Sequence, residues 1–592
     1  MNSTARGGNA VPPEAVRPNP SESESENSRP RPDQLWLFRR YPLRLVLPVL
    51  VIAALCALVT VTFMPDSPAA AVVAAAVVII ALIPLRGTSL AQFAEREIAY
   101  RLQLFRNRSS AVQHSSFDVP LSEGGSYGMR WDGDRLITIL RIDAQPRTVA
   151  RLSPSGLVGD DMLPLAEIAR CLDQFDIRLA AIDVISMGSR TAGSGSVARI
   201  YESILGPLPA VAHRTVWVVL RLDPLANAAA VHRRGGGAEG TLRSAVIATR
   251  RVANRLAAQD LSATVLSASE MNQVVTQLTL GAAPQDFTET QHYLSHNGLH
   301  HTTYRMTPEA LGPRGVAAVW STPSVASTIT VRMQRLRGTE SDGGYARSAG
   351  ASAESVAITA TARFTTRETP RPMRMPGLVA LPGKQLRALL FSLPLGTGVP
   401  ALPLDGHLGS PDTLSRVPVP IAGCGQLIGA DASGHGVALP LVSGHVRRVE
   451  IIGSVLVAKQ VILRAIALGA RVVVHTNRHE EWRPMVDVVD MPESLSLATW
   501  SAGSQLAGSY RSATMVVFDG IEPAGHLSDA TVMLLRRTGP LTDEFDADVV
   551  LVEDPSTAHL VTVRTASAVA DVYMVATPGE LGYLGGQQAV PA

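Results

Sequence analysis

The sequence is short of cysteine, of net charge and of metal-binding loops, and each shortage excludes a class of protein. It has three cysteines in 592 residues, and Cys171 and Cys424 lie far apart with no second cysteine near either. A disulfide framework is therefore excluded, and a reducing compartment is expected. Lysine and arginine total 53 against 51 for aspartate and glutamate, so no nucleic-acid partner is indicated. No Asp-x-Asp motif lies in a loop suited to a metal, which ranks a membrane-bound sugar transferase last among the functions considered.

Charge is also missing from two long apolar runs near the N-terminus. The first, residues 45–64, is long enough to cross a hydrocarbon core, which needs about 20 helical residues. The second, residues 69–85, is rich in alanine and valine and lies at the short end of that requirement. Pro65 and Pro68 mark a turn between them. We therefore predict a two-helix transmembrane hairpin within residues 34–88 that contacts the lipid bilayer.

The charges on either side of this hairpin predict its orientation. Arginines precede the first run and follow the second, whereas the turn carries only Asp66. The positive-inside rule then places both flanks in the cytoplasm, which predicts a multi-pass protein of the cytoplasmic membrane. A secretory signal peptide is the alternative, but it would have a shorter apolar core and no second run.

The segments around the hairpin have contrasting compositions. Residues 1–33 are rich in proline, serine and glutamate, and they have too few large apolar side chains to offset the entropy of ordering, so a disordered tail is predicted. Residues 89–112 mix an apolar stripe with arginines, which predicts a juxtamembrane helix. Its stripe could meet anionic lipid or pack on the chain's own cytosolic part.

Residues 113–400 alternate between strand and helix patterns and form the first predicted cytosolic domain. Residues 135–142, 179–186 and 214–222 are rich in β-branched and aliphatic residues, while residues 163–175, 197–205 and 241–258 have helical periodicity. This alternation favours an α/β domain with a largely parallel sheet. Residues 338–355 are rich in glycine, serine and alanine, so we expect a flexible loop there.

A glycine-rich motif precedes the helical stretch 241–258. Gly235, Gly237 and Gly240 match the spacing G-x-G-x-x-G, and a glycine loop before a helix can bind phosphate through backbone N–H groups. In a dinucleotide site, however, the glycines directly follow a strand, and here ten residues, 223–232, intervene. A packing turn is the preferred interpretation.

Three histidines recur at helical spacing further along. His292, His296 and His300 would share one face of a helix and could bind zinc. Gly298 interrupts such a helix, and no cysteine or carboxylate lies within the stretch to complete a site. We interpret these residues as a solvated or partly packed face and expect no metal.

The C-terminal region, residues 415–592, is predicted to be a second α/β domain and carries the strongest chemical signal. A strand candidate runs into Gly453, and a helix follows Lys459, which is the order of a P-loop. Ala458 replaces the second glycine of G-x-x-x-x-G-K-[ST], and Gln460 replaces the hydroxyl residue that binds Mg²⁺. A second apolar strand ends in Asp519, as a Walker B aspartate would, but a glycine follows it instead of a catalytic glutamate.

These departures predict a degenerate P-loop domain without catalysis. If a nucleotide bound at all, Gly453, Lys459 and Asp519 would hold it, so a nucleotide-binding protein or ATPase using residues 453–460 stays open as the alternative function. A chance match in an unrelated α/β domain is a further alternative. No catalytic residue and no cofactor are expected.

Several separated stretches together resemble one known family. After the two apolar runs come residues 127–133 (YGMRWDG), 216–224 (VWVVLRLDP), 234–237 (RGGG) and 250–256 (RRVANRL). These resemble the EccE family of the actinobacterial type VII (ESX) secretion machinery. The C-terminal region around residues 426–436 is similar to the start of an FtsK- or EccC-like ATPase domain.

The resemblance implies a function without supplying catalytic residues. It implies a structural, non-enzymatic membrane subunit of a secretion complex that contains EccB, EccC and EccD and supports the export of proteins. EccC is the ATPase of that complex, and the EccE family has no established activity.

Overall fold

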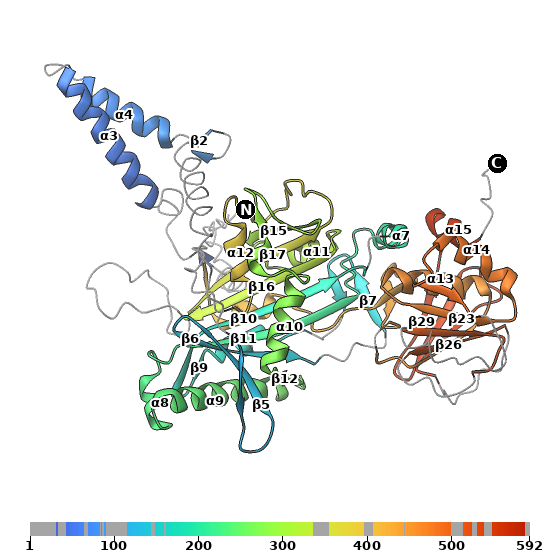
Figure 1. The fold of residues 1–592 in the computed structure, drawn as a ribbon. Helices are drawn as coiled ribbons and strands as arrows, with labels where there is room; N and C mark the ends of the chain where they lie inside the picture. The colour runs from blue at the N-terminus through green and yellow to red at the C-terminus, as the bar shows by residue number, and fades with distance from the viewer. Residues whose placement is uncertain are drawn as a thin grey trace, which may run out of the picture.

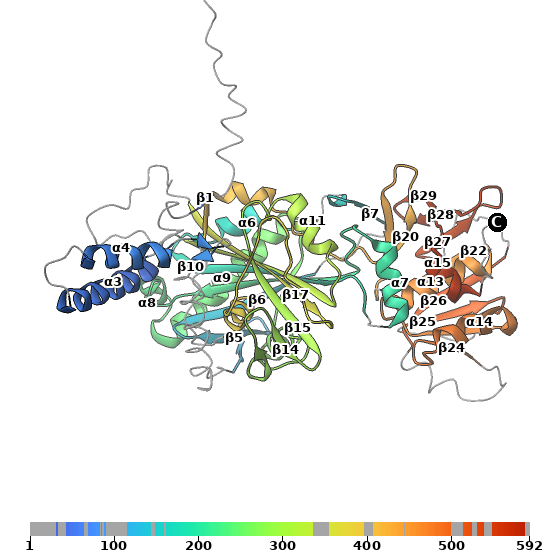
Figure 2. The same ribbon diagram turned by 90° about the horizontal axis from the view of Figure 1, so that it is seen from above.

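The computed structural model of the chain contains two units, each centred on one large β-sheet (Figure 1). The first unit holds a 15-stranded sheet and the second a 12-stranded sheet. Helices α3 and α4 lie at one end of the molecule and the second unit lies at the other, as Figures 1 and 2 both show. The structure describes residues 31–32, 43–63, 69–82, 84–85, 88–89, 115–143, 149–158, 162–192, 195–335, 355–395, 406–442, 444–498, 513–523, 530–537 and 547–585.

The centre of the first sheet is formed by five long strands in the order β17-β16-β10-β11-β6. These are β17 (Val356–Thr366), β16 (Ala326–Arg335), β10 (Ile177–Ser189), β11 (His213–Leu222) and β6 (Arg135–Ile142). The shorter strands are β1 (Arg31–Pro32), β4 (Phe117–Pro120), β5 (Ser126–Asp132), β9 (Asp173–Gln174), β12 (Ala263–Val265), β13 (Thr288–Glu289), β14 (Leu294–His296), β15 (Leu299–Met306), β18 (Leu378–Ala380) and β19 (His407–Gly409).

Helices cover both faces of this sheet. Apolar residues of α9 and α11 pack on one face, and those of α10 and α12 pack on the other. Along β6, Leu136 and Leu140 face the first layer while Ile137 and Ile139 face the second. The helices of the first unit are α6 (Leu165–Arg170), α8 (Ala228–Arg233), α9 (Gly237–Ala257), α10 (Ala268–Leu278), α11 (Pro313–Ser321) and α12 (Gln385–Phe391).

The prediction of a largely parallel sheet is wrong for this unit, because every strand pair in it is antiparallel. The physical reason is that helices cover both faces of the sheet. A strand buried on both faces has a nearly continuous apolar sequence, which is the usual signature of a parallel strand. The antiparallel β10 is buried on both faces in this way and therefore shows that signature. The predicted strands and helices lie close to the observed bounds, except for the helix predicted over residues 163–175, where only α6 forms.

Buried arginines join the sheet to helices α10 and α12. Arg332 bonds the buried carboxylate of Asp183 and the Phe391 carbonyl at 3.1 Å. Arg363, which is 2% exposed, donates to the Leu278 carbonyl at 2.7 Å. Phe391 and Leu278 are the last residues of their helices, where the helix dipole gives carbonyls a partial negative charge. The helix ends therefore compensate guanidinium charges that burial would otherwise make unfavourable.

The second sheet is parallel in one half and antiparallel in the other. Its strands follow the order β24-β23-β25-β26-β22-β27-β28-β29-β20-β21-β7-β8, and the pairs from β24 to β27 are parallel. The elements are β7 (Ala150–Ser153), β8 (Gly156–Val158), β20 (Gln426–Ala430), β21 (Gly436–Leu439), β22 (Arg448–Ile452), β23 (Val472–Thr476), β24 (Leu495–Leu497), β25 (Met515–Asp519), β26 (Thr531–Arg536), β27 (Val549–Glu553), β28 (Leu560–Thr565), β29 (Val569–Tyr573), α7 (Ser196–Leu205), α13 (Val455–Ala467), α14 (His479–Val489) and α15 (Pro578–Leu584).

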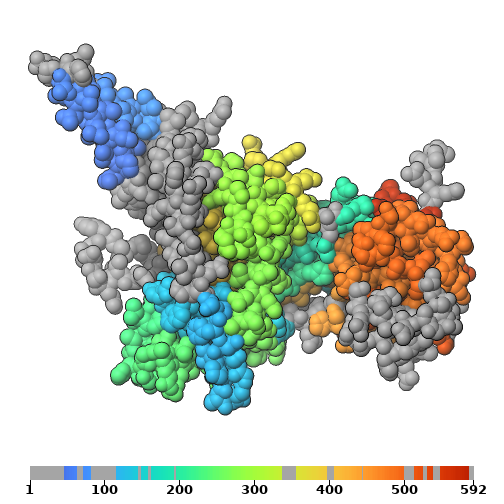
Figure 3. Space-filling model, viewed as in Figure 1, coloured from blue at the N-terminus to red at the C-terminus, as the bar shows by residue number. Residues whose placement is uncertain are grey.

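Two segments from the N-terminal half of the sequence complete this second unit. Strand β7 pairs with β21 and brings β8 with it to the end of the sheet. Helix α7 packs on α13, and the Tyr201 hydroxyl accepts a hydrogen bond from the Leu427 N–H at 2.8 Å. Figure 1 shows α7 beside α13. In the space-filling view the two units are in contact (Figure 3). A division of the chain between residues 400 and 415 stays a prediction.

The predicted transmembrane hairpin is wrong. Two helices form in its place, α3 (Leu43–Phe63) and α4 (Ala69–Leu82). Helix α4 ends before Pro84 and has 14 residues, which at about 1.5 Å per residue extend roughly 21 Å against a hydrocarbon core of about 30 Å. Helix α3 contains Pro48. In the part of the chain that the structure describes, we find no helix with the combined length and apolarity needed to cross a membrane.

Three other predictions fall wholly or mainly outside the described residues. They are the juxtamembrane helix at 89–112, the flexible loop at 338–355 and the disordered tail at 1–33. At the end of that tail, Arg31–Pro32 forms β1 and pairs with β19.

Candidate functional site

The degenerate P-loop predicted from the sequence is not supported, because residues 453–460 do not form a phosphate-binding loop. Strand β22 ends at Ile452 and α13 begins at Val455, so the link has only two residues. Lys459 therefore lies inside the helix, as do Ala458 and Gln460. A P-loop needs a longer turn whose N–H groups surround the phosphates.

A protein carboxylate occupies the start of this helix. The Glu553 carboxylate accepts from the Ser454 N–H at 2.5 Å, and the Ser454 hydroxyl accepts from Val457 N–H at 3.4 Å. A Cβ atom at Gly453 would lie 2.6 Å from a Glu553 oxygen. The helix dipole that would attract a phosphate thus acts on Glu553.

Lys459 and Asp519 lie around the same tryptophan and bond other protein groups. Lys459, 8% exposed, donates to the Leu584 carbonyl at 3.3 Å, and its Nζ lies 6.0 Å from the Trp482 ring centre. The fully buried Asp519 accepts from Trp482 Nε1 and from the Thr476 hydroxyl, both at 2.8 Å, and pairs with Arg478. A nucleotide would have to displace these contacts, so the arrangement gives the ATPase alternative no assembled site.

The glycine motif forms the tight start of α9 instead of a phosphate site. Gly235, Gly236 and Gly237 all have positive φ angles, which only glycine adopts readily. The N–H groups of Gly235 and Gly236 bond carbonyls of the preceding helix α8 at 3.2 and 3.0 Å. At Gly240 a Cβ atom would lie 2.2 Å from the Val231 carbonyl oxygen, so this glycine permits close packing of α8 on α9.

His296 and His300 lie on a β-hairpin and His292 lies just before it, so the three do not share the helix face that could have bound zinc. Strands β14 and β15 pair antiparallel through a turn at Asn297 and Gly298. His301 is buried beside Phe287 and bonds the Thr365 hydroxyl at 3.0 Å, and burial lowers its pKa to about 3. Among the described residues, no group of three or more histidine, cysteine or carboxylate side chains could hold a metal.

A different cluster, which sequence reasoning did not single out, surrounds the turn between β9 and β10. Phe175 occupies this turn with φ of 55° and is 97% exposed. Both values are unusual, since a bulky residue rarely adopts positive φ and a large aromatic side chain is seldom left in water. The Arg251 guanidinium lies 5.3 Å from the ring centre and bonds the Gln174 carbonyl at 2.8 Å.

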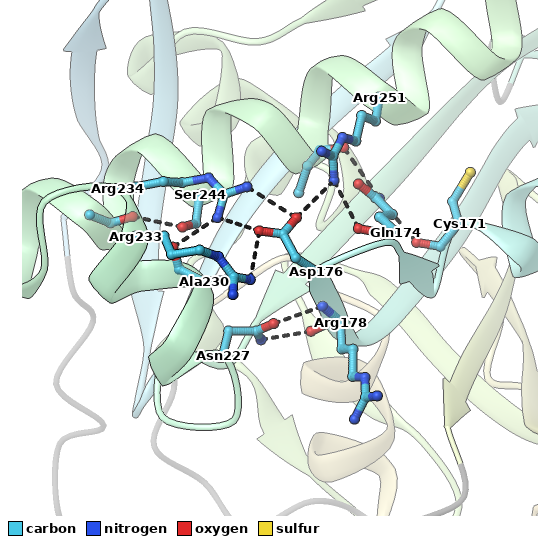
Figure 4. Close-up of polar contacts among 12 residues, drawn as sticks. Cys171, Gln174, Asp176, Arg178, Asn227, Ala230, Arg233, Arg234, Ser244 and Arg251 are labelled. Carbon is cyan, nitrogen blue, oxygen red and sulfur yellow. Dashed lines mark hydrogen bonds and ion pairs between the residues drawn. The ribbon is translucent and has the colours of Figure 1, made fainter.

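The carboxylate of Asp176 organises the arginines around this turn (Figure 4). Arg234 approaches it at 2.8 Å and Arg233 at 3.0 Å, both from the end of α8, and Arg251 of α9 lies 3.6 Å away. Hydrogen bonding to Arg234 is the main reason that the pKa of Asp176 is well below its ordinary value. The turn is therefore tied to two helices through one acidic residue.

A second exposed apolar residue lies on the neighbouring turn. Asn227 bonds both the N–H and the carbonyl of Arg178, at 2.7 and 2.8 Å, and so joins the β11–α8 turn to β10 (Figure 4). Leu225 in that turn is 79% exposed. Asp223 fixes the turn by accepting from the N–H groups of Leu225 and Ala226, both at 3.0 Å.

We call this surface the arginine corner and define it as Phe175, Asp176, Arg178, Leu225, Arg233, Arg234 and Arg251. It contains four arginines and one carboxylate. The rigid turns present two apolar side chains among positive charges, and aromatic and arginine side chains are the types enriched where proteins bind one another. The arrangement suits an acidic protein surface with an apolar recess.

The sequence signal for this corner was present but ambiguous. Phe175 ends the run of residues 163–175, whose apolar spacing predicted one amphipathic helix, whereas the structure has only the short helix α6 followed by β9. Phe175 lies directly between the polar residues Gln174 and Asp176, and this polar setting was the available hint.

Comparison with known sequences points to one family over part of the chain. Residues 210–306 match the family described as "Putative type VII ESX secretion system translocon, EccE". This segment contains β11, the Leu225 turn, and the helices that supply Arg233, Arg234 and Arg251. The resemblance to the EccE family is thus confirmed.

Curated relatives agree in name and differ in coverage. The ESX-1 secretion system protein EccE1 of Mycolicibacterium smegmatis is 27% identical over 32% of this chain and 41% of its own length. The ESX-5 protein EccE5 of Mycobacterium marinum is 26% identical over 45% of this chain and 64% of its own. The ESX-2 protein EccE2 of Mycobacterium tuberculosis is 25% identical over 61% of this chain and 63% of its own. The matches therefore cover less than two thirds of each relative.

Proposed function

We propose, with the resemblance to the EccE family as the premise, that this chain is a structural and interaction subunit of a type VII secretion complex that exports proteins. The observation that carries the proposal is the family match at residues 210–306, which includes most of the arginine corner. The partners we propose are the EccB, EccC and EccD subunits, and the location is the cytoplasmic membrane, where the chain is held through its contacts with them.

The arginine corner is the surface that we propose for docking. Phe175 and Leu225 offer apolar area that water disfavours, and burying them in a partner would contribute roughly 1.5 to 3 kcal/mol each. Arg178 and Arg233 pair with Asp173 and Asp176, but their side chains are 67% and 58% exposed, so they can also meet carboxylates of a partner at the rim. Such charges mainly raise the association rate and the specificity.

Co-purification from native membranes tests this function. The tagged full-length protein is extracted in detergent, and EccB, EccC and EccD are quantified in the purified sample. We expect all three with the wild-type chain. We expect at least tenfold less with the double variant Phe175→Ala and Leu225→Ala, because both side chains would lie inside the interface.

A matched control separates docking from general damage. Val488→Ala and Val569→Ala remove apolar side chains that are 48% and 60% exposed on the second unit, and they should leave co-purification unchanged. Exposed substitutions change stability by about 0.5 kcal/mol or less, so both double variants should unfold at the wild-type temperature. Co-purification that survives the corner variant would refute the docking surface, and a wild-type protein that purifies alone would refute the subunit function.

A further inference from the structure

Arg214 is a charged residue without a charged partner, placed where the two units meet. It lies near the start of β11, its guanidinium stacks 4.0 Å from the Trp320 ring centre, and Nη1 donates to the Ser186 hydroxyl at 3.1 Å. Its Nε is buried without an acceptor. In the described part of the chain, no carboxylate pairs with it. Burial lowers its pKa to about 10, so it is still protonated at neutral pH.

Two cavities are lined by this one arginine. The larger, about 550 Å³, has several charged or titratable side chains among mostly apolar walls, including Arg141, Asp143 and His213. The smaller, about 260 Å³, is apolar, and Arg214 is the only charged residue among its described walls. Those walls come from the β7–β8 hairpin, from α11 and from the segment before β20, and they include Leu157, Met162, Val211, Val316, Trp320 and Cys424.

The walls of the smaller cavity restrict the chemistry of a ligand. Its volume is close to the lower limit of about 300 Å³ for small-molecule sites, so it suits a small group. The Cys424 thiol is buried, which raises its pKa to about 11 and keeps it neutral. One positive charge in a mostly apolar cavity is complementary to a ligand that carries one negative charge on an apolar group. A phosphate, with up to two charges, would leave charge unpaired in the same chamber.

We propose that the smaller cavity binds a carboxylate carried on a short apolar group, with Arg214 as the charged partner of that carboxylate. Arg214 Nη2, which bonds no group among the described residues, would form the charge-assisted hydrogen bond, and Val316 and Trp320 would contact the apolar part. A partly buried guanidinium without a carboxylate is unfavourable, and pairing reduces that cost. The carboxylate could belong to a small free acid or to the C-terminal residue of a peptide. This site is independent of the arginine corner and of membership in a complex.

Calorimetric titration of the purified full-length protein tests the site with defined probes. The acid probe is 3-methylbutanoate and its neutral match is 3-methylbutanamide. We expect the acid to bind at least tenfold more tightly than the amide. We expect Arg214→Gln to lose this preference and Arg214→Lys to keep part of it, because lysine restores the charge without the planar donors.

A second variant makes the test independent of the arginine. Ala317→Leu on α11 fills the cavity and leaves Arg214 in place, so it should abolish acid binding even if Arg214→Gln fails to fold. A tetrapeptide ending in leucine, compared with its C-terminal amide, distinguishes the source: tighter binding of the peptide acid than of 3-methylbutanoate assigns a chain terminus, and equal or weaker binding assigns a free acid. The proposal is overturned if the wild-type protein binds neither acid, or if Ala317→Leu binds as tightly as wild type.

Discussion

Asp176 and Asp519 have similar partners and opposite surroundings. Each carboxylate pairs with arginine. Asp176 lies in the turn between β9 and β10, and Asp519 is the last residue of β25. Asp176 is partly exposed near the surface, between arginines whose side chains range from 15% to 58% exposed, and beside the exposed Phe175. Asp519 is fully buried and bonded by Thr476, Arg478 and Trp482. The first cluster has hydrogen-bond donors and apolar area that another molecule could contact. In the second cluster, the polar groups bond one another within the chain.

The comparison teaches that a motif predicts function only when its polar groups are free to act. The Lys459 and Asp519 pattern gave the stronger sequence signal, yet the fold uses both residues for internal contacts. The arginine corner gave almost no motif, yet it presents exposed aromatic and basic side chains. Three substitutions can break or sharpen this contrast.

The largest effect is expected from Asp519→Ala. Removing this carboxylate leaves the Arg478 charge and the Trp482 N–H without their buried acceptor, and breaking a buried ion pair typically costs about 3 to 5 kcal/mol. Urea unfolding of the full-length protein measures the loss. Asp519→Asn keeps the size and one acceptor, so its loss should be smaller. A loss below about 1 kcal/mol for Asp519→Ala would contradict the structural role that we assign.

A smaller effect is expected from Asp176→Ala. Exposed ion pairs contribute about 0 to 1 kcal/mol, so the free energy of unfolding should fall by no more than that. The folded-state pKa of Asp176 is below its unfolded value, so its contribution is present above the unfolded pKa and is lost only as pH falls through the lower folded pKa. The difference between variant and wild type should therefore be constant from about pH 5 to 8. Unfolding curves at several pH values check this, and a loss as large as that of Asp519→Ala would remove the contrast.

The smallest effect is expected from Lys459→Met. The lysine charge is buried, and among the described residues its hydrogen bond is to a carbonyl. Burial also lowers its pKa, so an apolar side chain of similar length should change stability by less than about 1 kcal/mol in either direction. Thermal unfolding of the two proteins provides the measurement. A loss of several kcal/mol would show that the lysine charge has an essential partner.

Local elements of the fold could be predicted from the sequence, and their assembly could not. The runs 135–142 and 214–222 correspond almost residue for residue to β6 and β11, because β-branched and aliphatic residues favour strands wherever they pair. Their direction in the sheet depends on which strands meet over long sequence distances, and burial on both faces hides the difference between parallel and antiparallel pairing. The length of α4 was overestimated because apolarity was extended through Pro84, which ends the helix.

The candidate site was less accessible to sequence reasoning than the fold. Arg233, Arg234 and Arg251 were visible as basic residues near a glycine motif, but their common partner Asp176 lies more than 50 positions away. Phe175 was interpreted as part of a helix stripe because apolar residues are usually buried. Only the turn geometry reveals that it is exposed.

Strand β7 and helix α7 belong to the second unit although they lie in the N-terminal half of the sequence, and this affects the chain during its synthesis. Strand β7 emerges from the ribosome before its partner β21, and about 280 residues separate them, which at roughly 5 to 20 residues per second amounts to about 15 to 60 seconds. During that interval the edge of β7 has unpaired N–H and carbonyl groups, the kind of edge that recruits foreign strands. We therefore expect the nascent chain to be open to such pairing until its last third has been made.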